Sequence, residues 1–242
     1  MIKPSILLIL LATIIPVAIA SPQLTSAQTL PPVQIAVKFE PPSRGAPGDR
    51  KGSSSRRICP AVAKPLTALI PQSNLGLTLS KHPTFWFYVP YTSDSQAEFI
   101  LLDENEDEIY KQVFSLKGTP GIINLQLPET ISLETGKQYK WQFSYRCNPT
   151  NSADDMYVEG AVEVAATENL VNPLLVGKTP QQQLEIYAAN GLWFETVTIL
   201  AQLRRDDVKN SAIATEWVEL LQSVDLETLA TEPILDCCTP KK

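Results

Sequence analysis

The sequence predicts a mainly β protein with an α-helical appendage, in the form of an immunoglobulin-like Greek-key β-sandwich followed by a small C-terminal helical unit. Short apolar runs recur about every ten to twelve residues between positions 75 and 165, which is typical of a sandwich. A pattern typical of a corner between two strands precedes one of these runs. After residue 165 the apolar period becomes that of helices.

The N-terminus predicts secretion. Lys3 precedes an apolar run over residues 6–20, which is interrupted by Pro16 and ends in the small residues Ala18 and Ala20. This is typical of a signal peptide, and we expect one at residues 1–27, cut after residue 20 or 27. A retained N-terminal anchor is the alternative. We expect a secreted or periplasmic protein with no transmembrane segment after signal cleavage, because no later run reaches the roughly 20 residues that a span needs.

Residues 28–58 are predicted to be a disordered basic tail. They are rich in Pro, Gly, Ser and Arg and show no apolar period. Between positions 41 and 58 five basic residues stand against Asp49, whereas residues 59–242 hold 13 Lys and Arg against 24 Asp and Glu. The composition favours a solvated linker, and the alternatives are a tail that meets an anionic partner or the acidic body itself.

The β-sandwich is expected over residues 59–168. Seven apolar runs predict its strands: 75–80, 85–91, 97–103, 108–114, 121–127, 139–146 and 157–165. In the sixth run aromatic and polar residues alternate, so its aromatic side chains should face the core. The preceding Leu133-x-x-Gly136-x-x-Tyr139 has the form of a tyrosine corner, in which the Tyr hydroxyl bonds to backbone and pins the turn.

A helical hairpin unit packed on the sandwich is expected over residues 169–242. Thr179, Pro180 and Gln182 form a helix start, and Asn190-Gly191 is a typical end, which predicts a helix over 180–189. Further helices are predicted over about 192–204 and 212–222, with a short turn at 225–230. The first pair resembles one tetratricopeptide-like hairpin, but a single hairpin cannot bury a continuous core as an array does.

Four cysteines should be paired in an oxidising compartment: Cys59, Cys147, Cys237 and Cys238. The sequence leaves all three connectivities open. A Cys59–Cys147 bridge is the first choice because both residues flank predicted strands. Cys237 and Cys238 could pair with each other, reach the body or bridge two chains. We expect no metal site, since there is no C-x-x-C motif and only one histidine.

The run FWFYVPY at 85–91 is apolar on both faces, so both faces need cover. Three interpretations are open: the helical unit packs over Trp86 and Tyr88, a neighbouring chain does, or these two rings form a ligand-binding surface for a sugar. The first needs nothing beyond this chain and is favoured because large exposed apolar patches are rare on monomers.

Enzyme chemistry finds little support. The single histidine, His82, precedes Pro83 at a strand start, and no nucleophile, zinc, dinucleotide or P-loop motif is present. Asp103-x-Asn105-x-Asp107 begins like a calcium loop and then fails, since Glu108 and Phe114 stand where Gly and Glu are required. We expect no catalytic residues, no cofactor, and no nucleic-acid partner because the body is acidic.

Several stretches together resemble a known family: PPSRGAPGDRKGSSSR, Cys59-Pro60, NLGLTLSKHPTFWFYVPY, WQFSYRCN and YAANGLWFETVTILAQLRR. The sequence is similar to the cyanobacterial secreted family described as domain of unknown function 928, from about Arg44 to Leu235. The resemblance implies a cyanobacterial source and a periplasmic or cell-surface setting. It implies no activity and no site residues.

Three functions are compatible with these observations. The leading expectation is a non-enzymatic interaction protein, a scaffold or adaptor with a protein partner, which binds through a sandwich loop end or the helical hairpin. The alternative is a module that binds a cell-surface glycan through Trp86 and Tyr88, with acidic loops and calcium as a possible addition. The third is a hydrolase with an unrecognised acid pair, for which Asp103, Asp107, Asp154 and Asp155 are the candidates.

Overall fold

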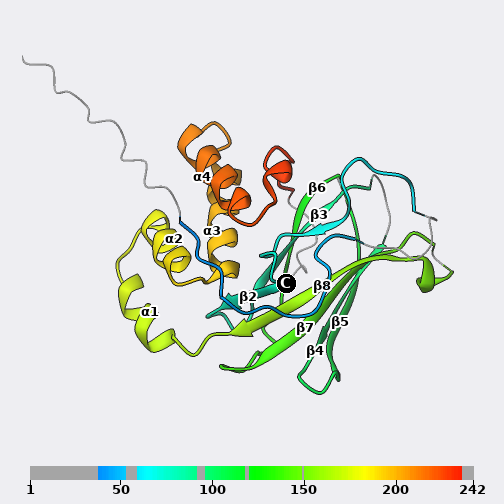
Figure 1. The fold of residues 1–242 in the computed structure, drawn as a ribbon, viewed down its shortest axis with the longest axis horizontal. Coiled ribbons are helices and arrows are strands. Elements are labelled where there is room, and N and C mark those ends of the chain that lie inside the picture. Colours follow the sequence, from blue (N-terminus) through cyan, green and yellow to red (C-terminus); the bar gives the residue numbers. More distant parts are fainter. Residues whose placement is uncertain (1–37, 53–58, 92–95, 118–119, 149, 236–242) are drawn as a thin grey trace, which may run out of the picture. The chain divides into compact units, whose positions relative to one another are not determined.

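The computed structural model describes residues 38–52, 59–91, 96–117, 120–148 and 150–235 (Figure 1). Two β-sheets and four α-helices make up this part of the chain, which confirms a mainly β protein with a helical part. The predicted signal peptide, Cys237 and Cys238 lie outside the described residues. Across the described ranges, no helix is both long and apolar enough to cross a membrane.

The two sheets hold three and five strands. The smaller has the order β1 (Thr67–Ala68), β3 (Thr84–Val89) and β6 (Gly121–Gln126). The larger has the order β2 (Leu75–Thr78), β8 (Met156–Val164), β7 (Gln138–Tyr145), β4 (Gln96–Leu102) and β5 (Glu108–Ser115). Only the β2–β8 pair is parallel among these pairings. All seven predicted strands are confirmed as β2 to β8, and the two-residue β1 is too short to show a period.

Aromatic rings fill the space between the sheets. Phe87 of β3 stacks on Phe143 of β7, with ring centroids 4.1 Å apart. Phe85 lies edge-on to Trp141 and tilted against Phe99, at 5.9 and 4.8 Å. These side chains are fully buried because alternate residues of β3, β4 and β7 point to the same interior. Pairs of this geometry add about 0.5–1.5 kcal/mol each beyond their area burial.

The loop that enters β7 is held by its own side chains. The Tyr139 hydroxyl accepts a hydrogen bond from the Glu134 N–H at 3.1 Å, and Leu133 is buried beside it. Gly136 has φ +81°, a left-handed conformation that a residue with a Cβ adopts at a cost. The disulfide Cys59–Cys147, which the sequence analysis favours, is confirmed and ties the start of the domain to the end of β7, with the Cα atoms 5.2 Å apart.

Four helices follow β8 in sequence: α1 (Glu168–Leu175), α2 (Pro180–Ala189), α3 (Trp193–Asp206) and α4 (Ser211–Gln222). The predicted helix over 180–189 is confirmed, and its capping box forms between Thr179 and Gln182. The two later helices are also confirmed to within two residues, and a 3₁₀ turn (Glu227–Leu229) follows them. Helix α1 was not predicted, because Pro173 interrupts its pattern.

Short connections join the helices into a stack in which α1 packs on α2, α2 on α3, and α3 on α4 (Figure 1). We call this arrangement the helical stack. Helices joined by such short turns are antiparallel neighbours. Helix α3 makes the main contact with the sandwich, against β2 and β3.

Of the predicted tail at 28–58 the structure describes residues 38–52, which we call the strap, and 28–37 and 53–58 lie outside the described residues. Their backbone bonds both sheets: the Glu159 N–H of β8 donates to Asp49, and the Ala68 N–H of β1 donates to Arg50, at 3.0 and 2.8 Å. Arg44 forms a two-bond ion pair with Glu163 of β8 at 2.5 Å. Arg44 of the strap therefore meets an acidic residue of the body.

Arg50 anchors the strap. Its buried guanidinium Nη1 donates to the carbonyls of Ile70 and Val224, at 3.0 and 2.5 Å, and so joins the strap to the chain just after α4. Burial lowers the pKa of the guanidinium, and the carboxylates of Asp225 and Glu227 oppose that shift. A cation at the carboxyl end of a helix is favourable, since the helix dipole places partial negative charge there.

A second polar contact joins α3 to the sandwich. Glu195, in the first turn of α3, accepts hydrogen bonds through Oε1 from the Thr78 hydroxyl and from the N–H groups of Leu79 and Ser80, at 2.6, 2.9 and 3.1 Å. Its Oε2 is buried with no hydrogen-bond partner among the described residues. Burial raises the pKa of this carboxyl, and its hydrogen bonds oppose the shift.

Replacing Arg50 should loosen the strap. In Arg50→Ala two buried carbonyls lose a charged donor, so we expect the free energy of unfolding to fall by about 2–4 kcal/mol. Urea titration followed by Trp fluorescence measures this. The matched control is Arg44→Ala, because its ion pair is half exposed and is worth only about 0–1 kcal/mol. Equal stability of the two variants would show that Arg50 does not anchor the strap.

Glu195 should make stability depend on pH. Because its folded-state pKa is raised, the stability it contributes is complete below the unfolded pKa of about 4.3 and is lost as pH rises through the folded pKa. Glu195→Gln keeps the acceptor oxygen and removes the titration. The stability of this variant relative to wild type should therefore increase between about pH 4 and pH 8. Thermal unfolding at a series of pH values measures the difference, and a constant difference would refute the assignment.

Candidate functional site

The two rings proposed as a sugar-binding surface are buried in the structure, and Trp86 contacts α3. Trp86 and Tyr88 are only 3% and 5% exposed. The Trp86 Nε1–H donates to the Thr198 hydroxyl of α3 at 2.9 Å. Neither ring offers a face to a ligand, so the ligand-binding interpretation of these residues is wrong, and the helical unit is what packs over β3.

The single histidine has a structural contact. His82 Nδ1 lies 2.9 Å from the carbonyl oxygen of Ile131, and the hydroxyl of Ser80 accepts a hydrogen bond from the His82 N–H at 3.0 Å. These bonds connect the segment before β3 to the loop after β6. The imidazole ring of His82 is thereby held to backbone, and among the described residues no hydroxyl or thiol is bonded to the ring.

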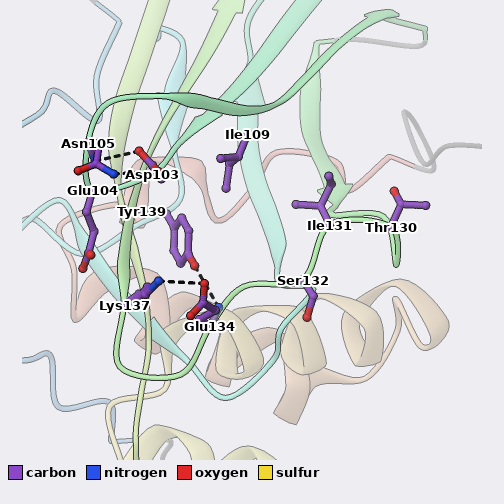
Figure 2. A pocket seen from close by; sticks show the side chains of 10 residues that line it. All are labelled: Asp103, Glu104, Asn105, Ile109, Thr130, Ile131, Ser132, Glu134, Lys137 and Tyr139. Carbon is purple, nitrogen blue, oxygen red and sulfur yellow. Dashed lines mark hydrogen bonds and ion pairs between the residues drawn. The ribbon is translucent and has the colours of Figure 1, made fainter.

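A polar hollow of about 330 Å³ lies between the β4–β5 turn and the loop from β6 to β7. Figure 2 shows the side chains that line it. They are Asp103, Glu104, Asn105, Ile109, Thr130, Ile131, Ser132, Glu134, Lys137 and Tyr139. Glu134 pairs with Lys137 at 2.9 Å, and its N–H bonds the Tyr139 hydroxyl (Figure 2). The polar groups of this wall therefore stabilise the corner itself.

The acidic turn that borders the hollow is held by hydrogen bonds to one of its own carboxylates. Asp103 Oδ1 accepts hydrogen bonds from the N–H groups of Asn105 and Asp107, at 2.8 and 3.0 Å. These bonds lower the pKa of the Asp103 carboxyl. Nowhere in the described ranges do three His, Cys, Asp or Glu side chains gather so as to hold a metal ion. The carboxylate is used to fix a tight turn.

The second acidic candidate pair serves the loop beside the disulfide. Asp154 is buried, and its Oδ2 accepts bonds from the side-chain amides of Asn148 and Asn151, both at 3.0 Å. Burial raises the pKa of the neighbouring Asp155 carboxyl, and the Arg146 charge opposes the shift. The four candidate acids thus sit in two separate loops, one after β4 and one after β7.

The exposed apolar residues of α1 form a surface that the sequence analysis missed. Leu170 and Leu174 lie one turn apart and are 73% and 51% exposed, and Val176 just after the helix is 80% exposed. We call these three residues the α1 surface. Pro173 between them is also exposed. Large aliphatic side chains left in water at one place are typical of an interaction site.

The opposite side of α1 explains why the helix is present at all. Val171 is buried, and with Leu192 and Ala165 it forms a small core of its own, against which Leu175 and Ile186 pack. One side of α1 therefore covers α2 and the end of β8, while the α1 surface faces away from them. The sequence feature that could have indicated this surface is the run LVNPLL at 170–175. Its four aliphatic residues cover a wider part of the helix than a single buried stripe needs.

Comparison with known proteins identifies a family and little more. No curated protein matches the sequence. A glycosyl hydrolase family 2 member from Bacteroides cellulosilyticus DSM 14838 is similar at 11% identity and a TM-score of 0.24, which carries no argument. That similarity covers 70% of this chain and 35% of the other, so the chain spans about a third of that protein.

The family model described as Domain of Unknown Function (DUF928) matches residues 48–234. The match begins within the strap and runs through both sheets and all four helices to the bridge that Ile234 forms with β6. The strap anchor, the sandwich and the helical stack thus lie inside one matched unit. The chain belongs to the DUF928 family.

Proposed function

We propose that this protein is a secreted or periplasmic, non-enzymatic interaction protein, a scaffold or adaptor whose β-sandwich carries a helical binding surface. The observation that supports this proposal is the exposure of Leu170 and Leu174 on one side of α1 and of Val176 just after the helix. Burial of a Leu or Val side chain gains about 1.5–3 kcal/mol. If a partner buried these side chains, that burial would therefore contribute favourable free energy to binding.

The partner should be a protein with an apolar helical face. Residues 169–177 contain no charged side chain, although the chain from residue 59 onwards is strongly acidic. A basic partner would be drawn to other parts of the body, and an acidic one would be repelled from most of it. An uncharged helical partner matches both the chemistry of the α1 surface and the way the other helices of the stack pack.

The rigid body behind α1 suits a scaffold. Helix α3 is held to the sandwich by Glu195 and by the Trp86–Thr198 bond, and α2 packs between α3 and α1. We further propose that the sandwich is immunoglobulin-like and Greek-key. The order β8-β7-β4-β5, beside a smaller β1-β3-β6 sheet, supports this because it follows the order of an immunoglobulin GFC sheet with one added strand.

The proposed setting is an oxidising one outside the cytoplasm of a cyanobacterium. The Cys59–Cys147 disulfide supports such a compartment, because disulfides persist where thiols are not kept reduced. The N-terminal apolar run supports export. The cyanobacterial part of the proposal rests on the family resemblance of the quoted stretches.

A photo-crosslinking residue placed at Leu170 or Leu174 in living cells tests the proposal. We expect both positions to capture the same protein, and the same residue at Val208 to capture none of it. Val208 is a matched control because it is 75% exposed in the α3–α4 connection, away from α1. The captured protein, once purified, should bind wild type and bind Leu170→Asn/Leu174→Asn at least about tenfold more weakly.

Equal capture from all three positions, or equal binding of the double variant, would refute the proposal. Circular dichroism of the double variant guards against misfolding, and Asn is a suitable replacement because Asn169 and Asn172 already occupy exposed positions of α1. A double variant that unfolds would be replaced by single Leu170→Asn, since Leu170 is the more exposed of the two.

A further inference from the structure

Three of the four sheet edges are protected by the chain itself. At β1 the strap adds an antiparallel bridge between Lys51 and Thr67, and at β6 the last described residues add a parallel bridge between Ile122 and Ile234. Strand β2 is only four residues long, and Glu195 of α3 bonds the backbone directly after it. Short edge strands and covering segments keep a sheet from pairing with another chain.

Strand β5, the remaining edge, is open. It is eight residues long and lies beside β4 at the margin of the five-stranded sheet (Figure 1). Within the described ranges no other segment bonds its outer side. Val113 in the middle of the strand is 43% exposed, and Lys111 and Ser115 on either side of it are exposed as well. A free edge of this length is a template for a further strand.

The backbone groups that face outward from β5 can be identified from the ladder of hydrogen bonds. The Arg146 N–H donates to the Gln96 carbonyl at 3.0 Å, so Gln96 turns its backbone groups toward the end of β7. Successive residues of a strand turn these groups to alternate sides, so Phe99 turns its own toward β5, where Gln112 is its register partner. The residues of β5 whose N–H and C=O groups point outward are therefore Lys111, Val113 and Ser115.

The middle of β5 lacks the features that usually block an edge strand. Proteins commonly use a proline, a bulge or charged side chains for this purpose. No proline lies within β5, and its pairing with β4 is regular from Tyr110 to Ser115. Its one charged residue after Glu108 is Lys111, whose ammonium group is held by Glu98 of β4 at 3.2 Å. The backbone of this edge is therefore available to a second strand.

We propose that β5 pairs with β5 of a second copy of this chain, antiparallel and across a two-fold axis, so that the two five-stranded sheets become continuous. A two-fold axis perpendicular to the sheet makes the two copies of a strand antiparallel and leaves each side chain on its own face. Strand β5 belongs to the sandwich, so this pairing is separate from the α1 surface.

The outward backbone groups place the axis at Val113. In that register Val113 lies opposite Val113 of the second copy, and Lys111 lies opposite Ser115 of the second copy. All the outward N–H and C=O groups of these three residues then have partners, because both members of each pair point across the interface. An axis at Gln112 would instead set Ser115 opposite Ile109, where the pairing of β5 with β4 shifts register.

The side chains fit the same register. The two exposed Val113 side chains cover each other, and on the other face Gln112 lies opposite the half-buried Phe114 of the second copy. The two Lys111 residues are four positions apart along the paired strands, which is about 13 Å. An axis at Lys111 would bring two ammonium groups together. A second copy therefore satisfies both the backbone and the charge of this edge.

The association should be weak. A standard interface buries about 800 Å² per partner, and a five-residue length of strand supplies only a fraction of that area. We therefore expect a dissociation constant of about 10 µM or higher. The acidic bodies of the two protomers repel each other, so a salt concentration of about 0.15 M, which screens that repulsion, suits the measurement.

Sedimentation velocity of the purified chain, as its host processes it, tests the pairing from about 1 µM to about 1 mM. Wild type should change from monomer to dimer over this range. Val113→Glu and Val113→Lys each place like charges on the axis and should each weaken the dimer at least about tenfold. The matched controls Val208→Glu and Val208→Lys should leave the association unchanged, because Val208 is 75% exposed in the α3–α4 connection.

Mixing the two charged variants tests the register. An equimolar mixture of Val113→Glu and Val113→Lys should form a dimer again, because opposite charges then meet on the axis. Circular dichroism shows whether each variant is folded. Val113→Asp replaces Val113→Glu, and Val113→Arg replaces Val113→Lys, if the first choice is unfolded.

A chain that stays monomeric up to about 1 mM, or a dimer that both charged variants still form, would overturn the inference. A dimer that both variants lose and their mixture does not recover would overturn it as well, since Val113 would then not meet its own copy. A photo-crosslinking residue at Val113 gives the remaining outcome. If it captures a different protein in cells while the purified chain is monomeric, the edge accepts a strand of that protein and the second copy is wrong.

Discussion

The burial of β3 on both of its faces is the constraint on which the rest of the structure depends. Phe85 and Phe87 fill the space between the two sheets, and Trp86 and Tyr88 are buried on the other side, where Trp86 bonds Thr198 of α3. A sandwich strand ordinarily leaves one face to water. In this protein the second face of β3 is covered by the helical part of the chain, so the sandwich and the helical stack share one core. The position of α3 is therefore set by β3. Helices α2 and α1 are then placed in turn by their neighbours.

Strand positions could be predicted from the sequence because each strand carries a period or an apolar run bounded by turns. Helix α2 could be predicted to the residue because Thr179, Pro180 and Gln182 mark its start and Asn190-Gly191 marks its end. Because β3 carries aromatic or aliphatic residues on both of its faces, the sequence also predicted that both faces must be covered. In each case the signal is local, within a few residues of the element it describes.

The candidate site could not be predicted by the same means. Helix α1 has a proline inside it and an uncapped start, so local signals argue against a helix, and its contact with α2 forms it instead. Leu170 and Leu174 are exposed because the other side of α1 meets α2. The sequence of α1 has apolar residues on more than one side, so it does not show which side will be buried. The strap is missed for a related reason. Its composition is that of a flexible linker, yet the buried contacts of Arg50 with residues far along the chain order it.

The Arg50 contact has a consequence for how the protein is made. Arg50 and Val224 are separated by 174 residues, so the strap enters a channel or leaves a ribosome long before the carbonyl that holds it. Contacts between segments so distant in sequence form late and slow the completion of folding. The strap also bonds Leu66, Ala68 and Ile70, which are close to it in sequence, so the Val224 bond is the contact that the chain completes last. One residue of the strap thereby makes the first and the last parts of the described fold depend on each other, because the Arg50 bond to Val224 cannot form until both are in place.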